Sequence, residues 1–263
     1  MHPVLLRLGP LTIHTYGALL AVAVLLGLWL ARRRAVASEL DSDRVWNLGV
    51  YMVLGGLVGA KLWLVGANWS YYLENPRQVF AVSTLQSAGV FYGGLFAALL
   101  VAVIYARRAE MPFLALTDVY APAVALGLPF ARLGCFSAGC CWGKPTDLPW
   151  GVTFTSEYAG QVVGTPLGQP LHPTQLYEAV AVAGIFVILL WLGRRQSFTG
   201  QLFAAFAILY GIARGIIEFF RADPDRTLLF DGRFSLIQFV SIGLILLGAW
   251  LWWKRPGNAA EVQ

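Results

Sequence analysis

The chain has 263 residues, of which 58% are hydrophobic and only 13% are charged, and its mean hydropathy is +0.65. Soluble domains carry about a quarter charged residues, so this composition excludes an ordinary soluble domain and indicates an all-α integral membrane protein. The net charge of +5 does not indicate nucleic-acid binding, because the basic residues form short clusters beside apolar runs instead of a basic stripe.

Seven apolar stretches are long enough to cross a hydrocarbon core, which needs about 20 residues. The predicted transmembrane helices are 16–30, 47–66, 89–105, 113–130, 174–192, 200–219 and 236–253. The first is expected to stay as a membrane anchor, because its arginines follow it and it lacks a small-residue cleavage site. A short strand is expected at 150–155, where the residues alternate, and a loose tail at 256–263. Without an internal repeat or a second domain, residues 1–263 are expected to form one polytopic membrane domain.

Basic clusters follow the first, third, fifth and seventh of these stretches. They are Arg32-Arg33-Arg34, Arg107-Arg108, Arg194-Arg195 and Lys254-Arg255. The positive-inside rule therefore predicts an outside N-terminus and a cytoplasmic C-terminus. With seven spans, the long connection 131–173 between spans four and five faces outward, as do 67–88 and 221–235.

The outward connection begins with a polar, glycine-rich segment, 132–146, that contains Arg132 and all three cysteines. A polar segment between membrane spans is costly to keep unless it has a function. Arg132 either snorkels to the membrane surface or contacts a bound ligand. The glycines that follow it favour the second alternative, because they let the backbone come close to a bound group.

A second charged cluster lies at the end of the sixth stretch. Tyr210, Arg214 and Glu218 are spaced i, i+4, i+8 and share one helical face. Arg214 and Glu218 either neutralise each other or present a guanidinium to an anionic ligand, and the planar fork of arginine suits phosphate. Two arginines on the outward side of a bundle, with no matching surplus of carboxylates expected nearby, indicate a phosphate-bearing partner, for which a phospholipid head group is the candidate in a membrane.

The three cysteines admit four interpretations. Cys135, Cys140 and Cys141 can be inert small core residues, a disulfide of Cys135 with one of the other two, or a catalytic thiol near Arg132. A metal site needs a fourth ligand, for which His172 and His14 are the outward histidines. We expect no metal and no cofactor.

Two tyrosines and a histidine stand at the ends of predicted spans. Tyr16 and Tyr92 are typical of the aromatic belt, although Gly93-Gly94 beside Tyr92 favours a close backbone approach. Before the fifth span, Thr174 is a predicted N-cap and Glu178 lies in the first turn, which leaves His172 unexplained.

These segments, taken in order, resemble the bacterial prolipoprotein diacylglyceryl transferase family over nearly the whole chain. The motifs are His14-Thr-Tyr-Gly, Phe91-Tyr-Gly-Gly-Leu, Arg132-Leu-Gly-Cys-Phe with Trp142-Gly143, His172-Pro-Thr-Gln-Leu-Tyr-Glu, Tyr210-Gly-Ile-Ala-Arg-Gly-Ile-Ile-Glu-Phe-Phe-Arg and Ser235 with Gln238.

The resemblance implies a seven-span enzyme of the bacterial inner membrane. Such enzymes move the diacylglyceryl group of phosphatidylglycerol onto the lipobox cysteine of a prolipoprotein signal peptide and release glycerol phosphate. Carried over to this chain, Arg132 and Arg214 would hold the lipid phosphate, with Tyr16 and Tyr210 lining the pocket. Glu218 would fix Arg214, and Gly143 would shape the loop.

The chain departs from the family pattern at three polar positions. Tyr92 stands where the family has a histidine, Cys135 where it has asparagine and Cys140 where it has glutamate. His172 or His14 would then replace the histidine as base. Besides the transferase, two alternatives stay open: a thiol-dependent membrane transferase acting on another lipid or acceptor, and a non-catalytic phospholipid-binding protein.

Overall fold

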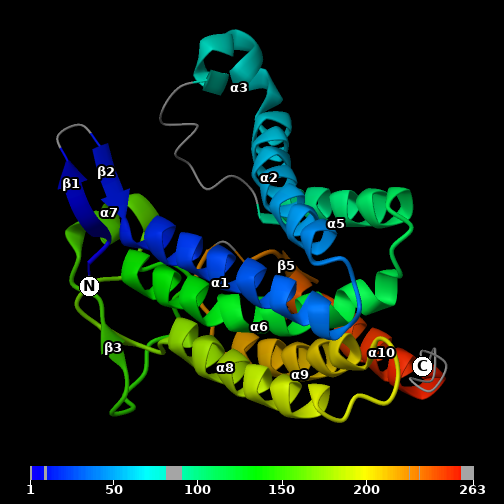
Figure 1. The fold of residues 1–263 in the computed structure, drawn as a ribbon. Coiled ribbons are helices and arrows are strands. Elements are labelled where there is room, and N and C mark those ends of the chain that lie inside the picture. The colour runs from blue at the N-terminus through cyan, green and yellow to red at the C-terminus, as the bar shows by residue number, and fades with distance from the viewer. Residues whose placement is uncertain (1, 9–10, 81–90, 225, 231, 256–263) are drawn as a thin grey trace. The chain divides into compact units, whose positions relative to one another are not determined.

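The computed structural model describes residues 2–8, 11–80, 91–224, 226–230 and 232–255, and these residues are mostly helical (Figure 1). Its long helices are α1 (Thr15–Ala37), α2 (Ser42–Ala67), α5 (Phe91–Arg108), α6 (Phe113–Ala138), α8 (Thr174–Gly193), α9 (Gln201–Glu218) and α10 (Leu236–Lys254). The shorter ones are α3 (Trp69–Glu74), α7 (Glu157–Val163) and the 3-10 helix η1 (Pro76–Phe80).

Within the described residues, six helices are long and apolar enough to cross a membrane. They are α1, α2, α6, α8, α9 and α10. Helix α5 has 18 residues and occupies the position of the predicted third span, but it is not one of these six. The start of that predicted span, at 89–90, lies outside the described residues, as does the predicted loose tail. The mostly helical membrane fold is confirmed, whereas the count of seven spans and their orientation stay predictions.

Two predicted helix ends were too early. Helix α1 continues through its arginines to Ala37, and α6 continues past residue 130 to Ala138. Arg132 and Cys135 therefore lie on a helix and not in the loop predicted at 131–173. The prolines inside α6 do not end it, since neighbouring groups can satisfy the freed backbone groups. It ends at Gly139, whose φ of 87° is in the left-handed region and whose N–H donates to the Cys135 carbonyl at 2.9 Å.

In the part of the chain that the structure describes, three two-stranded antiparallel sheets lie in the segments outside the long helices. Strands β1 (Val4–Leu8) and β2 (Leu11–His14) precede α1, β3 (Val152–Thr153) pairs with β4 (Pro170–Leu171), and β5 (Leu228–Leu229) pairs with β6 (Phe234–Ser235). Strand β3 lies within the predicted strand 150–155. Ser235 is the N-cap of α10, and its reciprocal hydrogen bonds with Gln238 form a capping box.

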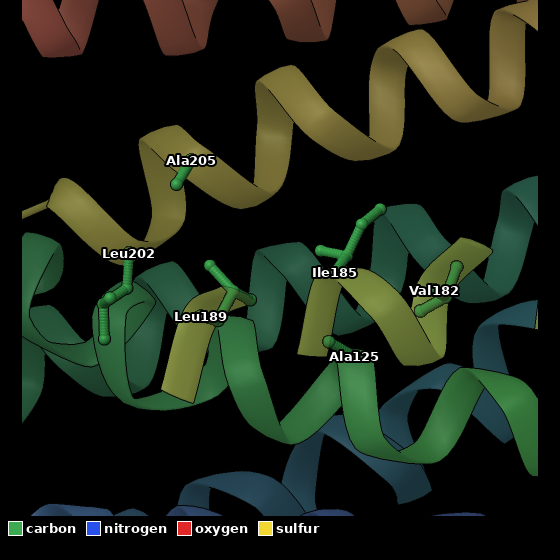
Figure 2. Packing of buried hydrophobic residues seen from close by; sticks show 6 residues of the cluster. All are labelled: Ala125, Val182, Ile185, Leu189, Leu202 and Ala205. Carbon is green, nitrogen blue, oxygen red and sulfur yellow. The ribbon is translucent and has the colours of Figure 1, made fainter. Parts of the chain in front are cut away.

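The chain forms two compact units, one of Met1–Ala31 with Thr117–Gln263 and one of Arg32–Leu116. In the first unit, α9 packs against both α8 and α10. Figure 2 shows part of its core, with side chains from α6, α8 and α9 directed toward one another. The labelled residues are Ala125, Val182, Ile185, Leu189, Leu202 and Ala205. This packing fixes three helices that each carry a charged residue of the site described below.

In the second unit, α2 and α5 pack closely through glycines. A Cβ on Gly93 would lie 2.3 Å from the Trp63 Cβ and 2.8 Å from the Gly59 carbonyl oxygen. A Cβ on Gly94 would lie 2.9 Å from the Gly56 carbonyl oxygen. Small residues let helix backbones approach each other in a membrane, so this pair of glycines has a packing role between the two helices.

Candidate active site

A buried carboxylate joins three helices of the first unit. One oxygen of Glu178, near the start of α8, lies 2.9 Å from Arg132 Nη2 of α6 and accepts a hydrogen bond of 3.0 Å from the Tyr210 hydroxyl of α9. The other oxygen lies 3.8 Å from Arg214 Nε, also of α9. The side chain of Glu178 is only 3% exposed. The two arginines predicted as a pair therefore face the same carboxylate.

The role predicted for the start of α8 was wrong. The N-cap is Pro173, which makes no side-chain capping bond, and the Thr174 hydroxyl instead donates to the Cys141 carbonyl at 2.6 Å. Glu178 forms ion pairs with Arg132 and Arg214, and its role is therefore not the stabilisation of the helix start. The sequence interpretation missed it because a carboxylate near a helix N-terminus has a sufficient local explanation.

Glu218 at the end of α9 is fully buried and neutralises a second set of arginines. Its carboxylate lies 2.8 Å from Arg214 Nη1, 2.9 Å from Arg226 Nε and 3.9 Å from Arg221 Nη1. The predicted pairing of Arg214 with Glu218 is confirmed as a contact. Arg226 also donates to the Arg221 carbonyl at 2.9 Å, so it contacts both the last residue of α9, Glu218, and the segment that follows the helix.

Arg221 and Asp223 form a bidentate ion pair beyond the end of α9. Arg221 Nε donates to Asp223 Oδ1 at 2.8 Å, and Nη2 donates to Oδ2 at 2.6 Å. Burial opposes the charged form of Arg221, but the hydrogen bonds to Asp223 and the nearby charges outweigh it and raise the pKa of Arg221. Burial also raises the pKa of Asp223 despite the opposing contact with Arg221. Arg221 is thus a permanent positive charge just beyond the end of α9.

The arginine network, as defined here, has four guanidinium groups and three carboxylates. Its members are Arg132, Arg214, Arg221, Arg226, Glu178, Glu218 and Asp223. Among these described residues one positive charge is in excess, which favours an anionic ligand because buried charges need neutralisation. In addition, Arg132 Nε is buried and has no hydrogen-bond partner in the part of the chain that the structure describes. A buried donor of this kind is ready to bind an anion oxygen.

Tyr16 lies beside this network because α1 and α6 approach closely. A Cβ on Gly134 would lie 3.1 Å from Tyr16 Cδ2 and 3.3 Å from Tyr16 Cα. The tyrosine is also close enough to Arg132 and Cys135 to interact with them electrostatically. The structure thus brings together the predicted site residues Tyr16, Arg132, Tyr210, Arg214 and Glu218.

The loop after α6 is threaded between two backbone segments at Gly143. Its N–H donates to the His172 carbonyl at 3.1 Å, and the N–H of Lys144 donates to the Phe220 carbonyl at 2.7 Å. His172 N–H in turn donates to the Lys144 carbonyl at 2.9 Å. Gly143 thus lies where three backbone segments meet, and its part in the site stays a prediction.

Replacing Gly143 should distort this loop. In Gly143→Ala, the new Cβ would lie 2.5 Å from the His172 carbonyl oxygen and 2.8 Å from that of Phe220, and both obstacles are backbone. We expect a loss of stability of about 1–3 kcal/mol, measured as a lower midpoint of thermal unfolding in detergent. Gly164→Ala has open space around its Cβ but a φ of 72°, so it tests backbone strain without the steric clash. A smaller loss for Gly143→Ala than for Gly164→Ala would contradict this account.

His172 is held by aromatic neighbours. Its Nδ1 lies 3.0 Å from the Tyr177 hydroxyl, which also accepts a hydrogen bond of 2.9 Å from Trp150 Nε1. Its ring packs edge-on against Phe220, with 5.1 Å between the ring centroids. These contacts explain the position of His172, and its role as a base stays a prediction.

The three cysteines are free thiols whose sulfur atoms lie within 4.8 Å of one another. Cys141 Sγ also lies 3.9 Å from Arg132 Nη1, so the thiols border the arginine network. Hydrogen bonds from the Cys135 and Cys140 thiols, with the charges of Arg221 and Arg132, lower the pKa of the Cys141 thiol. The disulfide considered from the sequence, between Cys135 and Cys140 or Cys141, is therefore not formed among these three described cysteines.

The remaining predicted residues belong to the other compact unit. Tyr92 is half-buried near the start of α5, and Gly93 and Gly94 make the contacts with α2 described above. Their predicted part in the reaction and in substrate binding stays a prediction.

Sequence reasoning missed Glu178, Arg221, Arg226 and Asp223 as members of the network. A signal for Glu178 was present, because an ionisable residue inside an apolar span is by default a candidate functional residue. Arg226 and Asp223 lie in the connection after α9, where charged residues are common and give no such signal.

Comparison with known proteins supports the resemblance seen in the sequence. Residues 3–254 match the family model described as prolipoprotein diacylglyceryl transferase. Proteins named phosphatidylglycerol–prolipoprotein diacylglyceryl transferase are similar to this chain in several bacteria. The one from Clostridium tetani is 34% identical over 94% of this chain and 95% of its own length. Those from Nitratidesulfovibrio vulgaris and Geobacter sulfurreducens are 36% and 37% identical over 97% and 94% of this chain, and over 94% and 92% of their own lengths.

The match extends over all of the apolar helices, and it includes the positions of the arginine network. Together with the six candidate spans, it identifies a multi-pass membrane protein. The chain belongs to the prolipoprotein diacylglyceryl transferase family.

Proposed function

We propose that this chain is a phosphatidylglycerol–prolipoprotein diacylglyceryl transferase. Its substrates would be phosphatidylglycerol and the lipobox cysteine of a prolipoprotein signal peptide, and its products a thioether-linked diacylglyceryl protein and glycerol phosphate. The relatives carry this activity in their names, and they cover nearly the whole chain.

The observation that carries the proposal is the position of Arg132 and Arg214 on either side of Glu178. The two guanidinium groups come from different helices and are nearly buried, with side chains that are 18% and 6% exposed. A phosphodiester bound beside Arg132 would meet a buried, unpaired Nε donor and a network with one excess positive charge.

The reaction forms one bond and breaks one. The acceptor thiol sulfur bonds to the glycerol carbon, the carbon–oxygen bond to phosphate breaks, and glycerol phosphate leaves with the electron pair. The phosphate gains negative charge as it leaves, so Arg132 and Arg214 stabilise the transition state more than the bound lipid. The thiol, with an ordinary pKa of about 8.5, must lose its proton to a base, for which Tyr92 and His172 are the candidates. The transfer itself requires neither a metal nor a cofactor.

The site would face the outer side of the bacterial inner membrane. We infer seven spans with an outside N-terminus, in which α5 is the third span. The basic residues at the C-terminal ends of α1, α5, α8 and α10 support this topology, because those ends would all be cytoplasmic. Residues 1–263 would then act as one polytopic domain whose outward loop follows α6.

A transfer assay tests the proposal. Purified protein in detergent is mixed with phosphatidylglycerol and a synthetic lipobox peptide, and the peptide mass is followed. We expect the gain of one diacylglyceryl unit and its loss in Arg214→Ala. Tyr92→Phe removes only the hydroxyl. Loss of transfer in this variant would indicate Tyr92 as the base, and retained transfer would indicate His172. No mass gain in a preparation that retains phosphatidylglycerol would instead indicate a non-catalytic lipid-binding protein.

A thiol-dependent transferase is the second candidate, because Cys141 Sγ lies 3.9 Å from Arg132 Nη1. The proposed transferase uses the thiol of its substrate, so the variant with all three cysteines replaced by serine should keep most of its activity. A single Cys141→Ala change that abolishes turnover, while Arg132→Ala does not, would favour the second candidate.

A further inference from the structure

We propose that Cys135, Cys140 and Cys141 form a three-coordinate thiolate site for one soft metal ion, Cu(I). This site is separate from the proposed transfer reaction, which needs no metal. It rests on the convergence of three sulfur atoms from the end of α6 and the loop that follows it.

The spacing of the sulfur atoms suits trigonal coordination. All three Sγ atoms lie within 4.8 Å of one another. Metal–sulfur bonds of about 2.3 Å at 120° place the sulfurs about 4.0 Å apart. A shift of less than about 1 Å in each distance therefore closes the group around an ion.

The backbone that carries these thiols is already fixed. Gly139 has a φ of 87° and Cys141 a φ of 59°, so the chain reverses tightly after α6. The carbonyl of Cys140 accepts a hydrogen bond of 2.6 Å from Gln175 Nε2, and that of Cys141 accepts one of 2.6 Å from the Thr174 hydroxyl. Helix α8 thus holds both cysteines from outside the cluster, which reduces the ordering cost of binding.

The composition of the cluster favours Cu(I) over Zn²⁺. Structural zinc sites are almost always tetrahedral with four protein ligands, whereas soft thiolate ligands select Cu(I). The group found among the described residues contains three cysteines and no histidine, aspartate or glutamate. His172, nominated from the sequence as a fourth ligand, is instead held by Tyr177 and Phe220.

The surrounding charges favour an anionic complex. Three thiolates around Cu(I) carry a net charge of −2 after the thiol protons have been released. Arg132 Nη1 lies 3.9 Å from Cys141 Sγ, and Arg221 interacts electrostatically with the same sulfur. These two guanidinium groups place positive charge beside the complex, although Arg132 is also paired with Glu178 and Arg221 with Asp223.

Competition with a chromogenic Cu(I) chelator tests the site in the full-length protein, in detergent, without oxygen and with a non-thiol reductant. We expect one Cu(I) per chain, and X-ray absorption should show three sulfur neighbours at about 2.3 Å. Because these are the only cysteines of the chain, the thiolate signal has a single origin.

Single variants distinguish three ligands from two. Cys135→Ser, Cys140→Ser and Cys141→Ser should each weaken Cu(I) binding by about tenfold or more, since even the loss of a group behind a ligand costs that much. His172→Ala is the matched control and should leave the affinity unchanged. Unchanged affinity in any one cysteine variant, two sulfur neighbours in the absorption spectrum, or no Cu(I) bound to the wild-type protein would overturn the proposal. The spectrum is recorded on the wild-type protein, so it stands even if a variant fails to fold.

Discussion

Arg132→Ala is expected to weaken phosphatidylglycerol binding by about 2–5 kcal/mol, which corresponds to about 30-fold to several thousand-fold in Kd. Arg132 is the arginine of the network with a buried nitrogen that has no partner among the described residues, and its side chain is 18% exposed. It is therefore placed to reach a lipid phosphate while it keeps its contact with Glu178. The measurement is lipid co-purification and titration with phosphatidylglycerol in detergent.

Two controls separate phosphate binding from a general loss of structure. Arg233→Ala removes an exposed arginine that is not part of the network, and it should bind phosphatidylglycerol like the wild-type protein. Arg132→Lys keeps the charge but loses the planar fork, so its affinity should lie between those of the wild-type protein and Arg132→Ala. If Arg132→Ala binds phosphatidylglycerol as tightly as Arg233→Ala does, Arg132 does not hold the phosphate.

Glu178→Gln is expected to destabilise the protein by about 3–5 kcal/mol, the usual cost of removing one partner from a buried ion pair. The carboxylate is 3% exposed and is shared by Arg132 at 2.9 Å and Arg214 at 3.8 Å. Without its charge, two guanidinium groups from α6 and α9 would face each other across a neutral amide. The midpoint of thermal unfolding in detergent measures the effect.

The exposed Glu157 of α7 gives a matched control, because Glu157→Gln makes the same chemical change where the side chain is solvated. Its effect should be within about 0.5 kcal/mol of zero. The double variant Glu178→Gln with Arg132→Ala should be less destabilised than the sum of the single variants, because it removes one of the two facing charges. Equal effects of Glu178→Gln and Glu157→Gln would show that Glu178 does not hold the arginines together.

Much of the local structure could be predicted from the sequence. The apolar runs predict the long helices because helix formation in a membrane depends on the hydropathy of consecutive residues. The pairing of Arg214 with Glu218 also follows from the sequence, since residues four apart share a helical face. The end of α6 was predicted too early, because a polar residue such as Arg132 does not break a helix that its neighbours stabilise.

The order of the polar motifs along the chain, read without any structure, determined the family and led to the prediction that Arg132 and Arg214 belong to the site. What only the tertiary structure decided is which residues from different helices meet. Glu178 bridges Arg132 and Arg214 because α6, α8 and α9 pack around a shared apolar core, and no local pattern encodes that meeting. Likewise, the three thiols converge because the chain reverses after Gly139 and is held by α8. Helical periodicity places a side chain on one face of its own helix, whereas the packing of side chains between helices selects the partner that it meets.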